Sequence, residues 1–328
     1  MSEAQVRSQK VQDLRAQGIE PYPSQAWIRS HTAQQVEDRF SQPDRQLEAG
    51  TVDPENLQLS LCGRIISKRD SGKLIFMDLR DASGKIQLKV DKKELTGDRG
   101  LTFDQAGKLL DVGDFIGVTG IGCRTQRGQL SIQVETIVPI AKATIPFPDN
   151  YYTVNDPEVL RRHREVDLAG YPESLARFLL RSHIVQSIRS YLYQQNFHEI
   201  ETPILQAIYG GAEARPFITH HNALDTDLYL RIAPELFLKR AVCGGFERVF
   251  ELGRVFRNEG IDSTHNPEFT SLEVYQAYAD YFGILTVVED IICNAAQTCL
   301  NTLTLQYQGQ EISLERQYVS PSSSTSTP

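Results

Sequence analysis

Five short runs in which apolar and polar residues alternate occupy residues 57–140, and no other feature limits the fold as strongly. Alternation of this kind predicts strands that bury one face. Turn residues such as Asp70-Ser71-Gly72 and Gln126-Arg127-Gly128 separate neighbouring runs. The region is therefore predicted to close into a small β-barrel. Its strands are expected at 57–66, 73–81, 84–90, 114–125 and 129–140, with a helix at 102–110 between the third and the fourth.

Three strands, one helix and two further strands follow one another in the order of an OB-fold, a barrel that frequently binds nucleic acid. Other small barrels have a similar pattern, so strand order alone leaves the choice open. Residues 60–95 hold nine Lys or Arg against five Asp or Glu, which suits a phosphate backbone. Charged side chains also occupy the solvent face of ordinary strands, and the composition does not separate these two explanations.

The rest of the composition excludes several classes of protein. A formal net charge of −8 argues against a protein that coats nucleic acid without regard to its sequence. The five cysteines form no C-x-x-C pair and are expected as reduced thiols rather than zinc ligands. His220 and His221 are adjacent in an extended segment and point apart, so they cannot share a metal ion. The charged N-terminus is no secretory signal and no stretch approaches about 20 apolar residues, so we expect a cytoplasmic protein without a membrane span.

The chain is predicted to have five parts. Residues 1–56 form an N-terminal helical extension, 57–142 the barrel, 143–160 a linker, 161–315 a second domain, and 316–328 a disordered tail rich in Ser, Thr and Pro. In the extension we expect helices over 3–18 and 31–40. In the second domain we expect helices over 177–196, 235–245 and 281–303, strands over 197–205, 227–234, 247–259 and 267–279, and a β-like segment over 303–315. The predicted fold class is α+β, with an OB-fold barrel followed by an antiparallel sheet with helices.

The last two of these strands predict a hairpin that carries chemistry. Alternation sends Phe250, Leu252 and Phe256 toward a core. A guanidinium on the opposite face is suited to clamp a carboxylate or a phosphate, and an exposed phenyl ring beside it offers a stacking surface for a base. A surface ion pair beside a half-buried tyrosine is the alternative that the residues alone leave open. The polar and aromatic side chains expected away from the core are Arg257, Glu259, Phe269, Glu273 and Tyr275, with His265 in the loop between the strands.

Several runs resemble the class II aminoacyl-tRNA synthetases, and in detail their lysine-specific branch. GRVFRNEGIDSTHNPEFTSLEVYQAYADY (253–281) resembles motif 2, and the combination of FRNEG with HNPEFT is specific to that branch. FHEIETPIL (197–205), with Pro203, resembles motif 1, the dimer-interface element. GRIISKRDSGKLIFMDLRDASGKIQLKV (63–90) resembles the anticodon-binding domain of the same enzymes. The resemblance covers roughly residues 57–315 and implies a homodimeric lysine–tRNA ligase that uses ATP and Mg²⁺, binds lysine and tRNA(Lys), and has no membrane partner.

The resemblance also implies a role for individual residues of the hairpin. Arg257 would be the catalytic residue that bridges the lysine carboxylate and the ATP α-phosphate, where charge develops as the adenylate forms. Phe269 would stack on adenine, Glu259 would contact the adenine or ribose side, and His265 the distal phosphates. The implied ATP-binding residues are thus Arg257, Glu259, His265, Asn266 and Phe269.

Lysine and the anticodon would be held by two further groups of residues. Two carboxylates suit a buried ammonium, and they reject neutral side chains of similar length because the acids would then be left unpaired. Gly211 fits a position where the backbone approaches the substrate closely. The implied lysine-binding residues are Gly211, Glu235, Glu273 and Tyr275. The implied anticodon-binding residues are Phe76, which would stack on a base, with Arg69, Gln87 and Gln129 as polar neighbours.

Two of the departures from the family bear directly on its function. Gln129 stands where the family usually has an acidic residue, which changes the hydrogen bonds available for anticodon recognition. The resemblance ends near residue 315, before motif 3 and before the family's acidic magnesium ligands, so the matching residues are expected to include no metal ligand. We therefore expect a truncated and catalytically impaired product with a marginally stable, incomplete second domain. A non-catalytic tRNA-binding fragment or paralogue is the alternative, and the relative that attaches lysine to a protein is disfavoured because it lacks the barrel.

Overall fold

The computed structural model describes residues 2–97, 100–146 and 156–316. The expected tail from residue 317 onward and residues 147–155 of the expected linker lie outside these ranges. The chain divides into two compact units, Met1–Leu175 and Ala176–Pro328, here called the N-terminal unit and the C-terminal unit. Each is described by itself, and the five-part domain organisation expected from the sequence stays a prediction.

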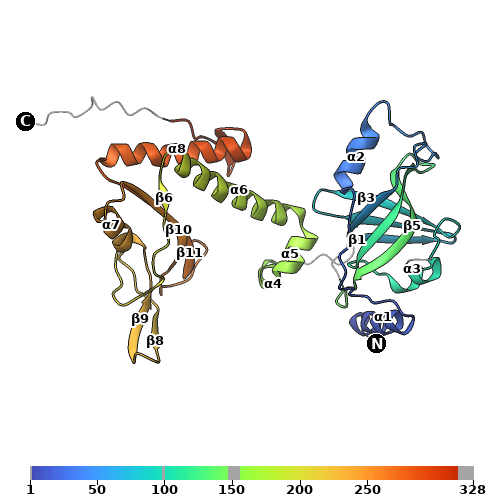
Figure 1. Ribbon diagram of the computed structural model, residues 1–328, viewed down its shortest axis with the longest axis horizontal. Coiled ribbons are helices and arrows are strands. Elements are labelled where there is room, and N and C mark those ends of the chain that lie inside the picture. Colours follow the sequence, from blue (N-terminus) through green and yellow to red (C-terminus); the bar gives the residue numbers. More distant parts are fainter. Residues whose placement is uncertain (1, 98–99, 147–155, 317–328) are drawn as a thin grey trace, which may run out of the picture. The chain divides into compact units, whose positions relative to one another are not determined.

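The N-terminal unit contains the expected barrel (Figure 1). Its strands close in the order β1-β2-β3-β5-β4, with β3 and β5 parallel and the other neighbours antiparallel. A helix, α3 (Phe103–Leu109), lies between β3 and β4 in the chain. This is the strand order of an OB-fold, as predicted. The strands are β1 (Leu59–Ser71), β2 (Leu74–Arg80), β3 (Lys85–Asp91), β4 (Phe115–Arg124) and β5 (Leu130–Ala141).

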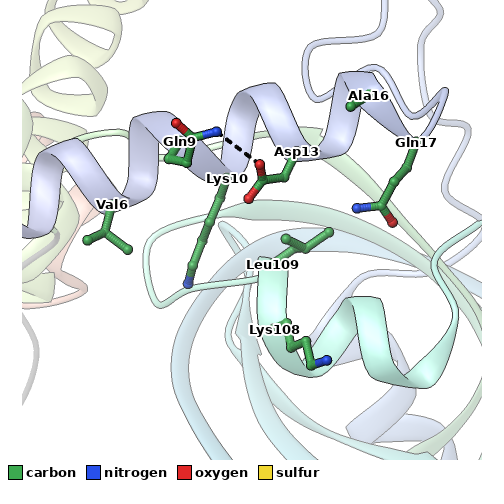
Figure 2. A pocket seen from close by; sticks show the side chains of 8 residues that line it. All are labelled: Val6, Gln9, Lys10, Asp13, Ala16, Gln17, Lys108 and Leu109. Atoms are coloured by element: carbon green, nitrogen blue, oxygen red, sulfur yellow. Dashed lines mark hydrogen bonds between the residues drawn. The ribbon is translucent and has the colours of Figure 1, made fainter.

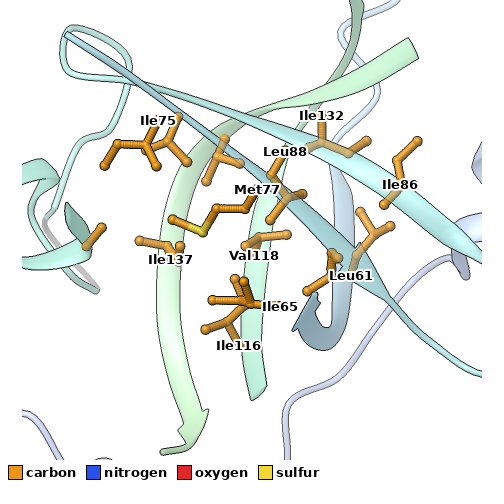
Figure 3. Close-up of a cluster of buried hydrophobic side chains, with 14 of the residues drawn as sticks. Leu61, Ile65, Ile75, Met77, Ile86, Leu88, Ile116, Val118, Ile132 and Ile137 are labelled. Carbon is orange, nitrogen blue, oxygen red and sulfur yellow. The ribbon is translucent and has the colours of Figure 1, made fainter. Parts of the chain in front are cut away.

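Alternation along the strands builds the barrel core. Burial along β2 and β3 switches at every residue, so that one face of each strand points inward. Figure 3 shows inward side chains from all five strands meeting in one cluster, and Ala106 and Leu109 of α3 belong to the same core. The buried set drawn there includes Leu61, Ile65, Ile75, Met77, Ile86, Leu88, Ile116, Val118, Ile132 and Ile137.

The N-terminal extension packs on the barrel through α1 (Glu3–Ala16) and α2 (Ala33–Ser41). Both helices begin at a capping box, in which a Ser or Thr and a Gln three residues later satisfy each other's backbone N–H groups. Leu14 of α1 and Phe40 of α2 join the barrel core. Figure 2 shows α1 beside α3, with a hollow between them that Val6, Lys10 and Leu109 help to line. The extension is therefore part of the same hydrophobic core.

The C-terminal unit is built around the expected hairpin of β10 (Arg248–Phe256) and β11 (Glu268–Gln276). A short strand, β6 (His198–Glu199), pairs with β10 in parallel, so this sheet is mixed rather than antiparallel throughout. Leu192 of α6 (Pro172–Gln194), Phe197, Phe250 of β10 and Ile291 of α8 (Tyr281–Leu300) form its buried cluster. The remaining elements are β7 (Leu205–Gln206), β8 (Ile218–His221) and β9 (Thr226–Leu230) in a second sheet, α7 (Glu235–Cys243), and the pair β12 (Thr304–Tyr307) and β13 (Gln310–Ser313).

Two expectations about elements are wrong. The strand expected over 197–205 is instead two strands of two residues, β6 and β7, which belong to different sheets. Between them, Thr202 turns toward the sheet to donate to Glu251, and Pro203 has no N–H with which to continue a ladder. Two short helices, α4 (Pro157–Arg162) and α5 (Arg164–Gly170), were not expected. Asp156, whose side chain accepts from the N–H of Glu158, and Pro157 at the first turn are the local signals that favour α4.

Helix α8 is the one described helix that is long and apolar enough, by length and composition, to cross a membrane. The sequence-based expectation of no such stretch did not identify it. Length and composition alone are weak evidence for a membrane span, because helices that pack on a sheet in non-membrane proteins meet the same criterion. Ile291 of α8 indeed packs in the cluster with Phe250 of the sheet.

Candidate functional sites

The pairing of β10 with β11 decides which side chains share a face of the hairpin. Residues directly opposite in an antiparallel pair point to the same side. Glu251 lies opposite Glu273, and Val255 lies opposite Phe269. Phe250 is on the other face and is buried in the core. The predicted division of the hairpin into a core face and a polar face is therefore confirmed for Phe250, Phe269, Glu273 and Tyr275.

Glu235, Glu273 and Tyr275 form a cluster on the polar face. Glu235 is the first residue of α7, and the Tyr275 hydroxyl donates to Glu273 Oε2 over 3.1 Å. Burial raises the pKa of Glu273, and the negative charges of Glu235 and Glu251 act in the same direction. Burial also raises the pKa of Tyr275, again with help from the charges of Glu273 and Glu235. The cluster is thus half-buried and rich in negative charge, which suits a cationic ligand.

Gly211 lies against this cluster. Its backbone has φ +87°, in the left-handed region that favours glycine. A Cβ added here would lie 2.8 Å from Cβ of Glu235 and 3.2 Å from Cβ of Ala233. The structure therefore brings together all four residues expected to bind lysine, and Gly211 leaves room beside Glu235 that a side chain would fill.

Arg257 and Phe269 form a second group at the end of the hairpin. The guanidinium carbon of Arg257 lies 5.1 Å from the centroid of the Phe269 ring. The Arg257 N–H donates to the Pro267 carbonyl over 2.8 Å, which closes the hairpin where β10 ends. Within the described ranges no carboxylate lies at ion-pair distance from Arg257, and its buried Nε has no hydrogen-bond partner. This guanidinium therefore has an unused donor that is suited to an anion.

The remaining residues expected to bind ATP lie in the exposed loop. β10 ends at Phe256 rather than at residue 259. The expectation that Glu259 lies on the polar face of this strand is therefore wrong. Asn266 is exposed, and His265 hydrogen-bonds through Nδ1 to Asp262 over 2.8 Å. Hydrogen bonds from Thr264 and His265 hold the pKa of Asp262 well below its usual range. In the described part of the chain these loop side chains make no hydrogen bond with Arg257.

A buried polar network lies on the same face of the sheet and was not predicted. Arg231 is 2% exposed and forms an ion pair with Glu251, which is 5% exposed. Thr202 Oγ1 donates to Glu251 over 2.6 Å, and Arg231 Nε donates to the Arg254 carbonyl over 2.8 Å. A Cβ on Gly253 would lie 2.5 Å from Arg231 Nη2, so a glycine makes room for the guanidinium. The only local sequence signal for this network is Glu251, an acid inside an apolar strand. The network itself joins three different segments of the chain, which no local pattern connects.

The N-terminal unit carries a hollow of ≈ 750 Å³ on the barrel. Its lining includes all four residues expected to bind the anticodon: Arg69, Phe76, Gln87 and Gln129. Arg69 of β1 pairs with Phe76 of β2, and Gln87 of β3 accepts a hydrogen bond from Ser131 of β5 over 2.9 Å. Four cations and one carboxylate line the hollow, namely Arg69, Lys89, Arg124 and Arg127 against Asp91. The surroundings are therefore basic although the chain as a whole is acidic.

Pro203, expected at a dimer interface, is exposed between β6 and β7. Its neighbours Ile204 and Leu205 are exposed large apolar side chains, and so is Ile208. Contiguous exposed apolar side chains are typical of surfaces that meet a partner.

Two family models match the chain. "tRNA synthetases class II (D, K and N)" matches residues 156–321, and "OB-fold nucleic acid binding domain" matches residues 59–140. The first covers half of the chain, including the hairpin with Arg257 and Glu273. The second covers the barrel and the hollow with Phe76.

Individual relatives agree with these matches. The chain is 47% identical to a lysine–tRNA ligase of Carboxydothermus hydrogenoformans over 311 residues, and 48% identical to one of Thermosynechococcus vestitus over 309 residues. It is 44% identical over 312 residues to a chloroplastic/mitochondrial lysine–tRNA ligase of Arabidopsis thaliana. These alignments cover 94–95% of the chain, but 60% of the two bacterial proteins and 50% of the plant protein.

Proposed function

Because the chain belongs to the class II tRNA synthetases of the D, K and N group, we propose that it acts in the ATP-dependent ligation of lysine to tRNA(Lys). The lysine carboxylate would attack the α-phosphorus of ATP and release pyrophosphate, and a terminal ribose hydroxyl of the tRNA would then attack the lysyl carbonyl of the adenylate and release AMP. The observation that carries the proposal is the cluster that Glu235 of α7 forms with Glu273 and Tyr275, two residues of the same hairpin that presents Arg257.

The carboxylate cluster supports lysine as the amino acid. The charges of Glu273 and Glu235 help to raise the pKa of Tyr275, and burial raises the pKa of Glu273. The ammonium of a bound lysine would add positive charge and donate up to three charge-assisted hydrogen bonds to these groups. An uncharged side chain of the same length would leave Glu273 without an added cationic partner, whereas Glu235 already pairs with Lys239 over 2.7 Å.

The Arg257 and Phe269 group supports ATP as the second substrate. Its guanidinium has an unused buried donor and no carboxylate at ion-pair distance in the described ranges. We assign it to the lysine carboxylate and the α-phosphate, where it would stabilise charge that develops in the transition state. Phe269 is assigned to adenine, and Glu259, His265 and Asn266 to the rest of ATP. Mg²⁺ would accompany ATP and neutralise its phosphates, but the described residues contain no group of three metal-ligating side chains, so no residue is assigned to it.

The barrel hollow supports binding of the anticodon. A basic concavity with a partly exposed phenyl ring provides both charge compensation for the backbone and a stacking surface for a base. We assign Phe76 to stacking, and Arg69, Gln87 and Gln129 to polar contacts with the anticodon bases.

Amino acid specificity tests the active-site proposal. If the chain is a competent ligase, lysine with ATP and Mg²⁺ drives exchange of labelled pyrophosphate into ATP, and the catalytic impairment expected from the sequence is then wrong. Norleucine, which has the same carbon chain without the ammonium, should drive no exchange. Glu273→Gln is expected to weaken lysine binding by at least about tenfold in calorimetry, because it removes a charged partner. Glu268→Gln, on the other face of the same strand, is the matched control. Equal binding of lysine and norleucine would refute the lysine pocket.

Binding of an RNA hairpin tests the barrel proposal separately. The probe is a labelled anticodon stem-loop with a lysine anticodon, measured by fluorescence anisotropy. Phe76→Ala is expected to weaken binding by about 1–3 kcal/mol, the contribution of one stacked base. Hairpin binding without pyrophosphate exchange would favour the alternative function, a non-catalytic tRNA-binding protein.

We also propose that the chain is a cytoplasmic homodimer that meets its partner through the surface around Pro203. The exposed Ile204, Leu205 and Ile208 support this assignment. Light scattering after size exclusion is expected to give twice the chain mass for the wild type and a smaller mass for Ile208→Asp. A monomeric wild-type chain at micromolar concentration would contradict the dimer.

A further inference from the structure

One wall of the barrel hollow comes from the N-terminal extension and not from the barrel strands. Residues 50–53 run alongside the end of β4. The Arg124 N–H donates to the Thr51 carbonyl over 2.9 Å, the Gly50 N–H donates to the Arg124 carbonyl over 2.9 Å, and Asp53 N–H donates to the Gly122 carbonyl over 2.8 Å. Gly50, Thr51 and Val52 all line the hollow. We call residues 50–53 the N-terminal wall.

The N-terminal wall holds Arg124 at both backbone groups, and the turn after β4 holds its side chain. Arg124 Nη1 donates to the Gly128 carbonyl over 2.8 Å. The guanidinium lines the hollow, yet its buried Nε has no hydrogen-bond partner in the described part of the chain. A buried donor without an acceptor is unfavourable, and it is more so when the group is charged. The arrangement is therefore that of a fixed cation with a donor left for a ligand.

We propose that Arg124, positioned by the N-terminal wall, binds a phosphate of the anticodon-loop backbone. The assignment rests on the proposed RNA-binding function and adds a residue and a chain segment to that site. With Nη1 engaged by Gly128 and Nε buried, Nη2 is the donor of the guanidinium that remains for a phosphate oxygen. The excess of cations around the hollow favours an anionic acceptor over a neutral base edge. Phosphate contacts of this kind fix the position of the RNA, while other residues read its bases.

The test compares the full-length wild-type chain with Arg124→Gln and Arg124→Lys, using labelled anticodon stem-loops at several salt concentrations. Arg124→Gln is expected to bind about tenfold more weakly. The loss is expected to be the same for hairpins with different anticodons, and the salt slope is expected to fall by about 0.7, as for one phosphate contact in a single strand. Arg124→Lys is expected to keep the salt slope of the wild type. Arg15→Gln is the control, because Arg15 lies on α1, outside the hollow, and is 48% exposed.

Three outcomes would overturn the assignment. They are binding by Arg124→Gln within about twofold of the wild type, a loss confined to one anticodon sequence, and an unchanged salt slope. Circular dichroism checks that the variants fold. If Arg124→Gln does not fold, Arg124→Lys serves as the test. A salt slope for Arg124→Lys that is lower than that of the wild type by one phosphate contact would then refute the phosphate assignment. If the wild-type chain binds no hairpin but Arg124 variants fold normally, the proposed RNA-binding function itself is wrong and this assignment falls with it.

Discussion

Glu273 illustrates how a single residue can oppose stability and serve binding. It is half-buried, and burial together with the charges of Glu235 and Glu251 raises its pKa. A raised pKa in the folded state means that folding favours the protonated form. The stabilisation that comes from the protonated Glu273 carboxyl is fully present below the pKa that this group has in the unfolded chain. It is lost as the pH rises through the higher pKa of the same group in the folded chain. At neutral pH the ionised carboxylate therefore destabilises the fold unless a cation is bound.

We predict that Glu273→Gln stabilises the chain at pH 7. Glutamine keeps an oxygen that accepts the Tyr275 hydrogen bond and removes the buried charge. The advantage should disappear as the pH falls below about 4.3, where the glutamate of the unfolded chain also becomes protonated. Urea denaturation at several pH values, with Glu268→Gln as the control, measures the difference. A Glu273→Gln chain less stable than the wild type at pH 7 would contradict the prediction.

Glu251 on the same face has the opposite effect, because a buried cation depends on it. Its carboxylate pairs with Arg231 and also accepts from Thr202. We predict that Glu251→Ala destabilises the C-terminal unit by about 3–5 kcal/mol, because Arg231 would remain buried without its counter-charge. Glu268→Ala breaks an ion pair with Arg254 in which both side chains are about half exposed, and should cost less than about 1 kcal/mol. Urea titrations followed by circular dichroism should separate the two variants, and equal midpoints would show that the buried pair contributes little.

At the scale of elements, a buried lysine joins the end of β5 to the segment before β4. The Lys142 side chain is 0% exposed, and its Nζ lies 2.5 Å from Asp111 Oδ2 and 2.8 Å from Asp114 Oδ2. Lys10 of α1 pairs with the same Asp111 over 2.6 Å. The segment before β4, the end of β5 and helix α1 therefore share one network of charges.

We predict that Lys142→Met destabilises the N-terminal unit by about 3–5 kcal/mol. The substitution keeps the apolar stem but leaves the buried Asp114 without its counter-charge, whereas the partly exposed Asp111 keeps its pair with Lys10. Lys92→Met, which removes an exposed pair with Asp104, is the matched control and should have an effect below about 1 kcal/mol. The free energy of unfolding can be followed through Trp27, and similar values for the two variants would refute the prediction.

At the scale of the whole molecule, the two units have cores of unequal size. One cluster in the N-terminal unit collects buried residues from all five barrel strands, α1, α2 and α3. The corresponding cluster in the C-terminal unit contains, among the described residues, Leu192, Phe197, Phe250 and Ile291. Buried apolar area is the main source of stability, so the N-terminal unit should be the more stable of the two.

We predict two unfolding transitions in urea, with the C-terminal unit unfolding first. Trp27 is the single tryptophan of the chain and packs against Gly117 of the barrel, where an added Cβ would lie 2.3 Å from its ring. Its fluorescence therefore reports the N-terminal unit, whereas far-ultraviolet circular dichroism reports helices and strands of both. The dichroism should begin to change at a lower urea concentration than the fluorescence. Coincident curves would mean that the chain unfolds as a single cooperative unit.

The sequence by itself determined the features that depend on local periodicity. Alternation every second residue identified the five barrel strands, and it placed Phe269, Glu273 and Tyr275 on one face of their strand, because successive side chains of a strand point to opposite faces. The motif resemblance named the residues of the lysine cluster and of the hollow before any contact was known. Glu273 and Tyr275 share one strand, and Arg69 and Phe76 lie on two paired strands, whereas Gly211, Glu235 and Gln129 come from other segments.

Only the tertiary structure decided which distant segments meet. The network of Thr202, Arg231 and Glu251, the parallel pairing of β6 with β10, and the N-terminal wall beside Arg124 each join residues that no local pattern connects. The end of β10 at Phe256, and with it the position of Glu259 beyond the strand, was likewise not visible in the alternation of the sequence. Such contacts depend on the distance between segments in the folded chain, and periodicity in the sequence carries no information about that distance.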